Sequence, residues 1–268
     1  MTIKNRRKRE LPSFKDVFRR ICRGVVLVGM LFLLWISVTG FYSYLLHTPY
    51  LEIKEITVLG GDKIGSLEII EESRVHLGEN LLTVDLEGVS ERLERNPWVK
   101  RAMVKRLFPS GVEMMIEERT PAALIKFDAF YLIDLDGVVF KKMTKEDNID
   151  LPIITGVAME ELIQDVPEAS EGVFKALNLI EILDENSLLK PENISEIEIG
   201  PSYELSLYTL NNAVKIGIGD KDFRKRLSRF EKITAILKGN FKDVDFIDLD
   251  YDKKAVLRYT RVPKGYPI

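Results

Sequence analysis

Residues 98–118, WVKRAMVKRLFPSGVEMMIEE, give the strongest fold signal in the sequence. Apolar and polar residues alternate over 98–107 and again over 112–118, and the turn residues Phe108-Pro109-Ser110-Gly111 separate the two runs. Alternation with a period of two is typical of a half-buried strand, and a Pro/Gly turn between two such runs is typical of a hairpin. This stretch therefore predicts two antiparallel strands.

One strand and two helices are predicted before the hairpin. Residues 51–59 alternate in the same way and are followed by Gly60-Gly61. Residues 66–75, which begin with a serine cap, and residues 86–95, which end at Asn96-Pro97, have apolar residues at helical spacing. The predicted inner-face residues are Leu67, Ile70 and Val75 in the first helix and Leu86, Val89 and Leu93 in the second. The order over residues 50–119 is therefore β-α-α-β-β.

Further towards the N-terminus, residues 25–46 read VVLVGMLFLLWISVTGFYSYLL and contain no charged side chain. As a helix they would span about 33 Å, enough to cross a bilayer. The alternative is a cleaved signal peptide, whose apolar region is usually only about 7–15 residues and precedes small residues at the cut site. The first alanine of the chain is Ala102, and aromatic residues at 41, 42 and 44 stand where an interfacial belt is expected. We predict an uncleaved transmembrane helix at 25–46.

Charge is distributed unevenly on the two sides of this span. Residues 1–24 carry nine Lys/Arg and two acids, whereas residues 47–268 carry thirty Lys/Arg and forty acids. Short flanks rich in Lys/Arg remain cytoplasmic, so we predict a cytoplasmic tail and an exported body, as in a single-pass type II membrane protein. The tail could also bind anionic lipid or nucleic acid, but a topology signal accounts for it. Cys22, the only cysteine, precedes the span, so the exported part has no disulfide.

Residues 120–268 are predicted to form a second domain that begins at Thr120-Pro121. The predicted strands are 123–127, 131–133, 138–140, 196–199, 205–208, 214–218, 246–249 and 255–259. Two helices are predicted, with inner faces formed by Phe174, Leu177, Ile180 and Ile182/Leu183 in 174–183, and by Phe223, Leu227, Phe230, Ile233 and Ile236/Leu237 in 222–237. The acid-rich residues 160–171 are interpreted as a surface loop. The fold class is therefore α+β, with a mainly antiparallel sheet in this domain.

Residues 130–140, FYLIDLDGVVF, raise an enzymatic alternative. An apolar strand that ends in Asp-x-Asp-Gly presents the nucleophile and general acid of haloacid-dehalogenase-like phosphatases, roles that Asp134 and Asp136 would take. That fold needs repeated β-α units and a parallel sheet, which the sequence does not predict. We interpret the motif as a tight turn between antiparallel strands, and Asp220, in Gly219-Asp220-Lys221-Asp222, as a helix cap.

Other chemistry has weak support in the sequence. His47 and His76 are the only histidines, and neither has metal-ligand spacing or a triad order around it. Gly217-Ile-Gly219 lacks the third glycine of a dinucleotide loop. We therefore predict no enzymatic activity, no cofactor, no metal, no small-molecule substrate and no nucleic-acid partner.

Several motifs in order resemble the FtsQ/DivIB family of cell-division proteins. They are WVKRAMVKRLFPSGVEMMIEERTPAALI, YLIDLDGVVF, LPIITG, NAVKIGIG, FRKRLSRFEKI and DVDFIDLDYDKKAVLRY, all after a membrane span. The resemblance covers nearly the whole chain and implies a POTRA domain at 50–119 followed by an FtsQ-type β domain at 120–268. It also implies a divisome scaffold at the septum that binds FtsB and FtsL and links early and late division proteins to septal peptidoglycan synthesis.

The resemblance implies a partner surface on the last strands and the long helix. Matched by motif, its residues are Tyr251, Leu257, Tyr259, Arg226 and Arg229. An open sheet edge with aromatic and arginine anchors suits strand addition. The alternative is that Tyr259 closes the core and the two arginines are solvated. Arg258 precedes Tyr259 where the family often has a small residue before a tryptophan or another large aromatic, so the chemistry of the edge could differ.

A third interpretation keeps the POTRA-like domain and assigns the chain to outer-membrane assembly or secretion. Proteins of that kind join the domain to a transmembrane β-barrel built from amphipathic strands of about ten residues. No run of such strands follows here. We therefore favour the divisome scaffold.

Overall fold

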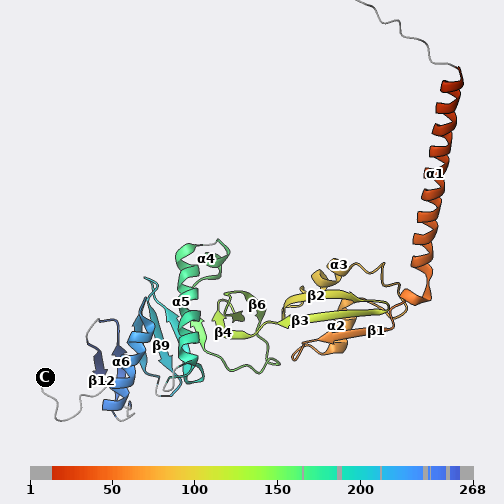
Figure 1. The fold of residues 1–268 in the computed structure, drawn as a ribbon. Helices are drawn as coiled ribbons and strands as arrows, with labels where there is room; N and C mark the ends of the chain where they lie inside the picture. The colour runs from red at the N-terminus through yellow and green to blue at the C-terminus, as the bar shows by residue number, and fades with distance from the viewer. Residues whose placement is uncertain are drawn as a thin grey trace, which may run out of the picture. The chain divides into compact units, whose positions relative to one another are not determined.

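The computed structural model describes residues 14–164, 166–185, 189–211, 213–237, 241, 243–251 and 254–259 (Figure 1). It contains two compact units. The first unit holds the described residues up to Leu93 together with Arg101–Ile116, and the second holds Glu94–Lys100 and the described residues from Glu117 onward. Residues 1–13 of the predicted tail (1–24) lie outside the described residues. The predicted domain limits, 50–119 and 120–268, remain predictions.

Helix α1 (Phe14–His47) contains the apolar segment. Its stretch Arg23–His47 has a mean hydropathy of 2.2, and none of the tested window is buried. The helix is therefore long and apolar enough to cross a membrane, as a single-pass anchor requires. It begins before residue 25, because the basic residues that precede the apolar stretch continue the same helix.

The first unit continues with a β-α-α-β-β module, as the sequence predicted. Its elements are η1 (Pro49–Leu51), β1 (Glu55–Leu59), α2 (Ser66–Ser73), α3 (Leu86–Leu93), β2 (Val99–Leu107) and β3 (Gly111–Glu118). The sheet order is β1-β3-β2, and β1 runs parallel to β3. Helices α2 and α3 pack on the sheet and bury Ile69, Val89 and Leu93 against its apolar side chains.

Two details of this module differ from the prediction. The strand predicted from residue 51 begins only at Glu55, because residues 51–53 pair instead with residues 79–81 through backbone hydrogen bonds. In α2 the predicted inner-face residue Leu67 is 83% exposed, whereas Ile69 is fully buried. Ser66 is the first helical residue, and the cap position is Gly65, which forms no side-chain cap bond.

In the described part of the second unit, nine strands form one sheet. Its elements are β4 (Pro121–Lys126), β5 (Phe130–Asp134), β6 (Val139–Lys142), β7 (Ile153–Thr155), α4 (Met159–Ile163), α5 (Pro167–Asp184), η2 (Pro191–Asn193), β8 (Ile194–Ile199), β9 (Leu205–Thr209), β10 (Lys215–Gly219), α6 (Phe223–Ile236), β11 (Val244–Asp248) and β12 (Val256–Tyr259). The strand order is β12-β11-β10-β9-β8-β7-β4-β5-β6.

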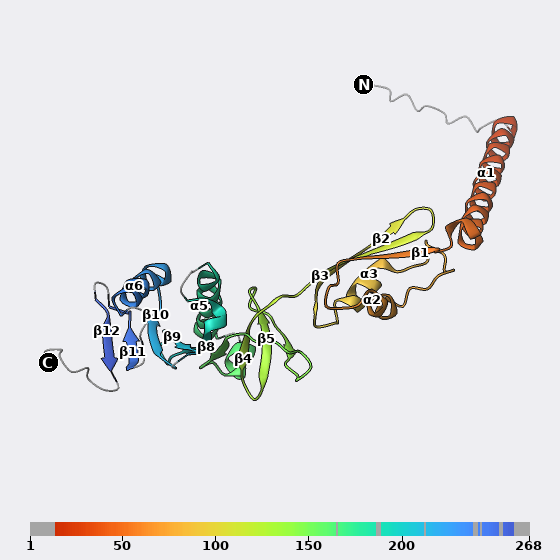
Figure 2. The same cartoon turned by 90° about the horizontal axis from the view of Figure 1, so that it is seen from below.

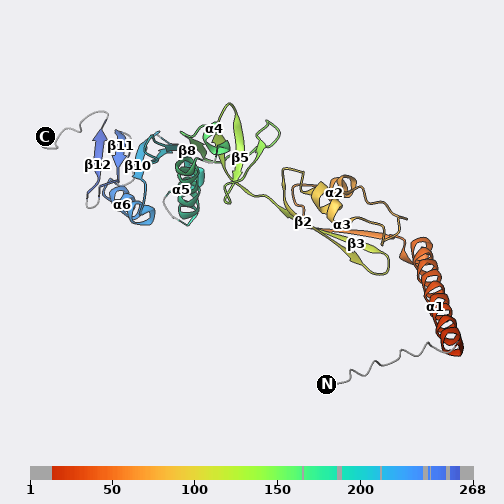
Figure 3. The same ribbon diagram turned by 90° about the horizontal axis from the view of Figure 1, so that it is seen from above.

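Most neighbours in this sheet are antiparallel, as predicted. The parallel pairs are β10–β11, β4–β7 and β7–β8. Helices α5 and α6 lie on the same face of the sheet (Figures 2 and 3). Their buried residues, Leu177 and Phe230 among them, join the strands in one core. On the other face, β4 and β5 bury Leu124 and Leu132, whereas β8, β9 and β10 carry the polar residues Glu196, Tyr208 and Lys215 in the same row.

Several predictions for the second unit were wrong in detail. Strand β7 was missed, since three residues are too few to show alternation. Residues 160–171 were expected to be a loop but contain most of α4 and the start of α5, where Pro167 occupies a first-turn position that suits proline. The predicted inner-face residues Phe174 and Ile236 are exposed. Asp220 is not the helix cap, because Asp222 holds that position without a side-chain bond.

Candidate docking surface at the end of the nine-stranded sheet

Strand β12 forms one edge of the large sheet. It pairs antiparallel with β11, with Leu257 opposite Ile247 and Arg258 opposite Phe246. Among the described strands, none pairs with the other side of β12. An edge strand presents a row of backbone N–H and C=O groups that can pair with an added strand. The position of β12 in the sheet therefore satisfies the first requirement of the predicted partner surface.

The side chains of β12 alternate between two environments. Leu257 and Tyr259 are half-buried and pack against the core that the helices cover. Val256 and Arg258 are exposed. The predicted residues on this strand thus brace it against the core and also keep part of their surface accessible at the edge.

Arg258 is held on the exposed face of the sheet. Its Nε lies 2.9 Å from Asp245 Oδ2, and its guanidinium lies 5.3 Å from the centre of the Phe246 ring. Both partners belong to β11, the neighbouring strand. The large residue that departs from the family pattern is therefore directed over the sheet face.

Helix α6 fastens the turn between β11 and β12. Arg229 donates hydrogen bonds to the backbone oxygen of Tyr251 and, at 3.3 Å, to that of Lys254. The Tyr251 ring is exposed, with Lys254 Nζ 5.0 Å from its centre. The structure thus brings Arg229 and Tyr251 together at one end of β12, although 22 residues separate them in the sequence.

Arg226 has a different place. Its side chain is buried, with 4% of the residue exposed. It donates to the Ile218 carbonyl oxygen, and its Nη2 lies 2.7 Å from Asp250 Oδ1. Gly219, at φ 80°, leaves room for the guanidinium, since a Cβ there would overlap it. The alternative that Arg226 is a solvated helix residue is therefore wrong. From inside the core, Arg226 holds the turn before β12 through its ion pair with Asp250.

We define the C-terminal surface as β12, the described residues 249–251 and 254 of the turn, and Arg226 and Arg229 of α6. Sequence reasoning missed Asp250 and Lys254, which belong to this surface through their contacts with Arg226 and Tyr251. An available signal was the spacing of Arg226, three residues after Phe223 and four before Phe230 on the apolar side of α6. That spacing indicates a buried arginine, which needs a carboxylate partner.

The helix-free face beside this surface has its own cross-strand network. Glu198 accepts hydrogen bonds from Lys215 Nζ at 2.6 Å and from Tyr208 Oη at 2.8 Å. These bonds, chiefly that of Lys215, lower the pKa of Glu198, and Glu198 raises the pKa of Lys215. Because these groups already satisfy one another, a partner gains more from the strand edge than from this face.

Asp134 and Asp136 occupy the turn between β5 and β6, as the structural interpretation of the DLDG motif predicted. Asp134 Oδ2 lies 2.6 Å from Arg119 Nη1, and its Oδ1 accepts a hydrogen bond from the Val138 N–H at 2.9 Å. Gly137 has φ 80°, a conformation that favours glycine. Asp134 therefore stabilises the turn. Both of its carboxylate oxygens accept hydrogen bonds within the turn and from Arg119, so the carboxylate is not positioned as a nucleophile.

Asp136 forms an exposed ion pair, in which its Oδ2 lies 2.7 Å from Lys100 Nζ. The hydrogen bond between them lowers the pKa of Asp136 and raises the pKa of Lys100. Within the described residues, no group of three or more His, Cys, Asp or Glu side chains could hold a metal ion.

We expect Asp134→Ala and Asp136→Ala to differ strongly in their effect on stability. The Asp134 side chain is 6% exposed, and its loss leaves Arg119 and the Val138 N–H without their partner, at a cost of about 2–4 kcal/mol. The Asp136 side chain is 57% exposed, so its loss should change the free energy of unfolding by less than about 1 kcal/mol. Urea unfolding measures both. Equal effects would contradict the assignment of Asp134 to the turn.

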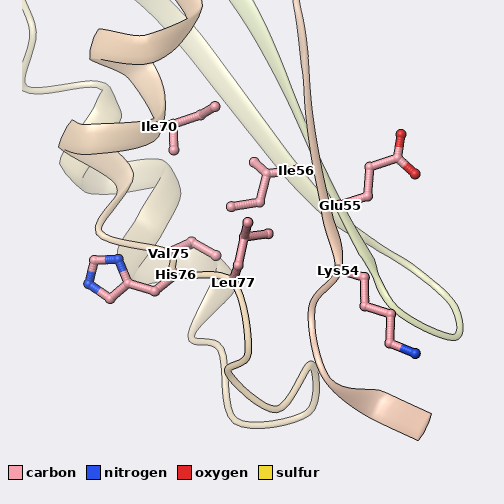
Figure 4. A pocket seen from close by; sticks show the side chains of 7 residues that line it. All are labelled: Lys54, Glu55, Ile56, Ile70, Val75, His76 and Leu77. Atoms are coloured by element: carbon pink, nitrogen blue, oxygen red, sulfur yellow. The ribbon is translucent and has the colours of Figure 1, made fainter. Parts of the chain in front are cut away.

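A second candidate surface lies on the first unit. Strand β1 is an edge strand, and a groove of about 540 Å³ lies between it and the end of α2 (Figure 4). Its lining residues are Lys54, Glu55, Ile56, Ile70, Val75, His76 and Leu77. Apolar side chains line its inside, while His76 points outward at the rim. An edge strand beside an apolar groove can accept an extended segment.

The chain matches two protein families along its length. Residues 51–119 match the family described as POTRA domain, FtsQ-type, and residues 123–250 match that described as Cell division protein FtsQ/DivIB, C-terminal. The second match contains Arg226, Arg229 and residues 249–250 of the C-terminal surface, and it ends before Tyr251 and β12. The first match contains the groove beside β1.

Similar proteins carry the corresponding names. Cell division protein FtsQ of Geobacter sp. (strain M21) is 34% identical over 217 residues, which cover 81% of this chain and 79% of the relative. Cell division protein FtsQ of Syntrophotalea carbinolica is 32% identical over 214 residues, which cover 80% and 76%. Cell division protein DivIB of Clostridium acetobutylicum is 26% identical over 209 residues, which cover 75% and 82%.

Proposed function

Because the chain belongs to the FtsQ/DivIB family of cell-division proteins, we propose that it is a divisome scaffold that binds FtsB and FtsL outside the cytoplasm. In this role it links early and late division proteins to septal peptidoglycan synthesis. Its work is binding, with no substrate and no cofactor. The single observation that carries the proposal is the position of β12 as the edge strand next to α6.

The mechanism is strand addition to β12. An extended segment of FtsB pairs with the free backbone groups of β12, which supply affinity without depending on side chains. Leu257 and Tyr259 offer apolar and aromatic contacts along the strand, and Tyr251 offers an exposed ring at the turn. Arg229 and Arg226 hold that turn in place before the partner arrives, which reduces the ordering cost of binding.

The membrane topology follows from the anchor and the charge split. We assign residues 1–24 to the cytoplasm, 25–46 to the inner membrane, and the POTRA domain (50–119) and β domain (120–268) to the periplasm. The excess of Lys/Arg before α1 supports this orientation. Recruitment to the division septum follows from the proposed partners. The POTRA domain is the proposed contact for division proteins that act upstream.

The phosphatase alternative has little support from the site. Asp134 is engaged by Arg119 and by the backbone of its own turn. The strand that ends at Asp134, β5, pairs antiparallel with both of its neighbours, β4 and β6, whereas that fold carries its nucleophile on a strand of a parallel sheet. Phosphatase turnover that disappears in an Asp134→Asn variant would reverse this judgement.

Depletion of the protein in cells tests the proposed function directly. Loss of a divisome scaffold is expected to give unseparated filaments, because septal synthesis is not recruited. Cell length and septum number measure the outcome, and expression of the wild-type chain from a second copy is the control that should restore division. Normal division after complete depletion would contradict the proposal.

A further inference from the structure

We propose that the end of the first unit next to α1 is a membrane-contact surface, where Tyr50, Leu77 and Phe108 enter the lipid headgroup region. This inference goes beyond binding to division proteins. It requires only that α1 spans the bilayer, and its occupant is the lipid surface from which the C-terminal end of α1 emerges. We call this set of three residues the juxtamembrane triad.

Backbone hydrogen bonds gather three chain segments at this end of the module. The Gly78 N–H donates to Ile53 O at 2.9 Å, and the Lys54 N–H donates to Ser110 O at 2.8 Å. The segment after α1, the turn after α2 and the β2–β3 turn are thereby joined. The β2–β3 turn lies at the same end of the small sheet as η1 (Figure 1).

A side-chain clamp joins the same end to α1. Asn80 Nδ2 donates to the carbonyl oxygens of Leu45 and Leu46, each at 2.9 Å, while Asn80 Oδ1 accepts from the Leu82 N–H at 2.9 Å. The last four carbonyl groups of a helix have no partner within it, so Asn80 satisfies two of them. Asn80 is therefore a positioning residue that holds its turn at the level where the apolar helix ends.

Arg106 braces the turn from the hairpin side. Its Nε donates to Leu81 O at 2.8 Å, and its Nη2 donates to Val84 O at 2.7 Å. The hairpin and the turn that holds α1 are thus cross-linked by a planar group with fixed donor directions. A membrane contact at the hairpin turn therefore also restrains the position of the turn after α2.

Each gathered segment presents one large exposed side chain. Tyr50 is 68% exposed, and Leu77 and Phe108 are each 65% exposed. Large apolar side chains on separate turns at one end are typical of a contact surface, and aromatic rings favour the headgroup level of a bilayer. Lys54, also exposed, can pair with lipid phosphates.

Helix length places the triad at the correct depth. The apolar stretch of 25 residues would be about 37 Å long, compared with a hydrocarbon core of about 30 Å, so the end of α1 reaches into the headgroup region. Leu77 is three residues from Asn80, a reach of at most about 11 Å. A lipid occupant is therefore continuous with the span, whereas a protein occupant would have to displace the headgroups.

Depth-dependent fluorescence quenching tests this proposal. In full-length chain with Cys22→Ser, single cysteines at 50, 77 and 108 are labelled with an environment-sensitive fluorophore in nanodiscs of phosphatidylcholine with brominated acyl chains. The matched controls are cysteines at Leu67 and Met103, which are exposed apolar positions of the same unit. We expect quenching at 50, 77 and 108 at least about threefold greater than at the controls.

In a chain that also carries Trp98→Phe, Trp35 is the remaining tryptophan, and its position within the apolar stretch reports whether α1 is inserted. If Trp35 is quenched but the labels at 77 and 108 are quenched no more than the controls, the proposed membrane contact is wrong. The assay contains no division partner, so its failure would leave the FtsB proposal unaffected. Stronger quenching of these labels only after adding a partner protein would also overturn the lipid assignment.

Asn80→Asp tests the positioning role. It keeps the oxygen that accepts from the Leu82 N–H and removes the donor to Leu45 and Leu46, so we expect quenching at 77 and 108 to fall by about half or more. Asn96→Asp is the control, because Asn96 Oδ1 likewise accepts from a backbone N–H two residues later, at 3.1 Å. Unchanged quenching in Asn80→Asp would overturn the role assigned to Asn80.

Discussion

A chain carrying both Leu257→Glu and Tyr259→Ala is expected to bind a periplasmic FtsB segment at least about 100-fold more weakly than the wild type. Truncation of central interface anchors commonly costs 2 kcal/mol or more each, and about 2.7 kcal/mol corresponds to 100-fold. The glutamate adds a charge at a half-buried edge position, which an incoming apolar strand would have to desolvate. Titration of labelled segment into full-length chain in nanodiscs measures the affinity.

Two further variants separate binding from folding. Val256→Glu introduces the same charge at the neighbouring residue of β12, whose side chain is exposed on the opposite face. If the partner uses the strand edge and the face that carries Leu257, the dissociation constant should stay within about threefold of the wild-type value. Tyr251→Ala removes an exposed ring outside the packed core and should weaken binding about tenfold without changing the unfolding midpoint. Undiminished capture by the Leu257/Tyr259 double variant would rule out the proposed C-terminal surface.

Local periodicity explains what the sequence predicted well. The hairpin at 98–118 and the β-α-α-β-β order depend on contacts between residues close in the chain, which alternation, helical spacing and turn residues encode directly. Strand β7 was not predicted from the sequence because its three residues are stabilised by pairing with β4 and β8, and neither of these strands is adjacent to β7 in the sequence. The beginning of α5 was not predicted because acidic residues are typical both of a first helical turn and of a solvated loop.

The edge position of β12 could not be predicted from spacing. Strand order depends on which distant segments pair, and β10 and β11 pair in parallel only because α6 crosses between them. The resemblance supplied Tyr251 and Arg229 as separate candidates, while their hydrogen bond became visible only in three dimensions. The resemblance also placed Arg226 on the partner surface, although its helical spacing from Phe223 and Phe230 indicates the buried side of α6.

Arg226→Ala is expected to destabilise the second unit by about 2–3 kcal/mol, whereas Arg224→Ala should cost less than about 1 kcal/mol. The two arginines are two residues apart on α6, yet the Arg226 side chain is 5% exposed and the Arg224 side chain is 66% exposed. Removal of Arg226 leaves the Ile218 carbonyl and Asp250 without their donor. Denaturant unfolding that gave equal losses for both variants would contradict the buried role of Arg226.

The same variant should weaken FtsB binding although Arg226 has almost no accessible surface, because Asp250 adjoins Tyr251 at the turn that leads into β12. A double-mutant cycle of Arg226→Ala with Asp250→Asn isolates this coupling, and we expect an interaction of at least about 1 kcal/mol in both stability and binding. Binding must be measured where each variant remains folded by circular dichroism. If the two substitutions are coupled in stability but not in binding, the turn can shift without moving the edge of β12. The partner would then bind β12 independently of α6.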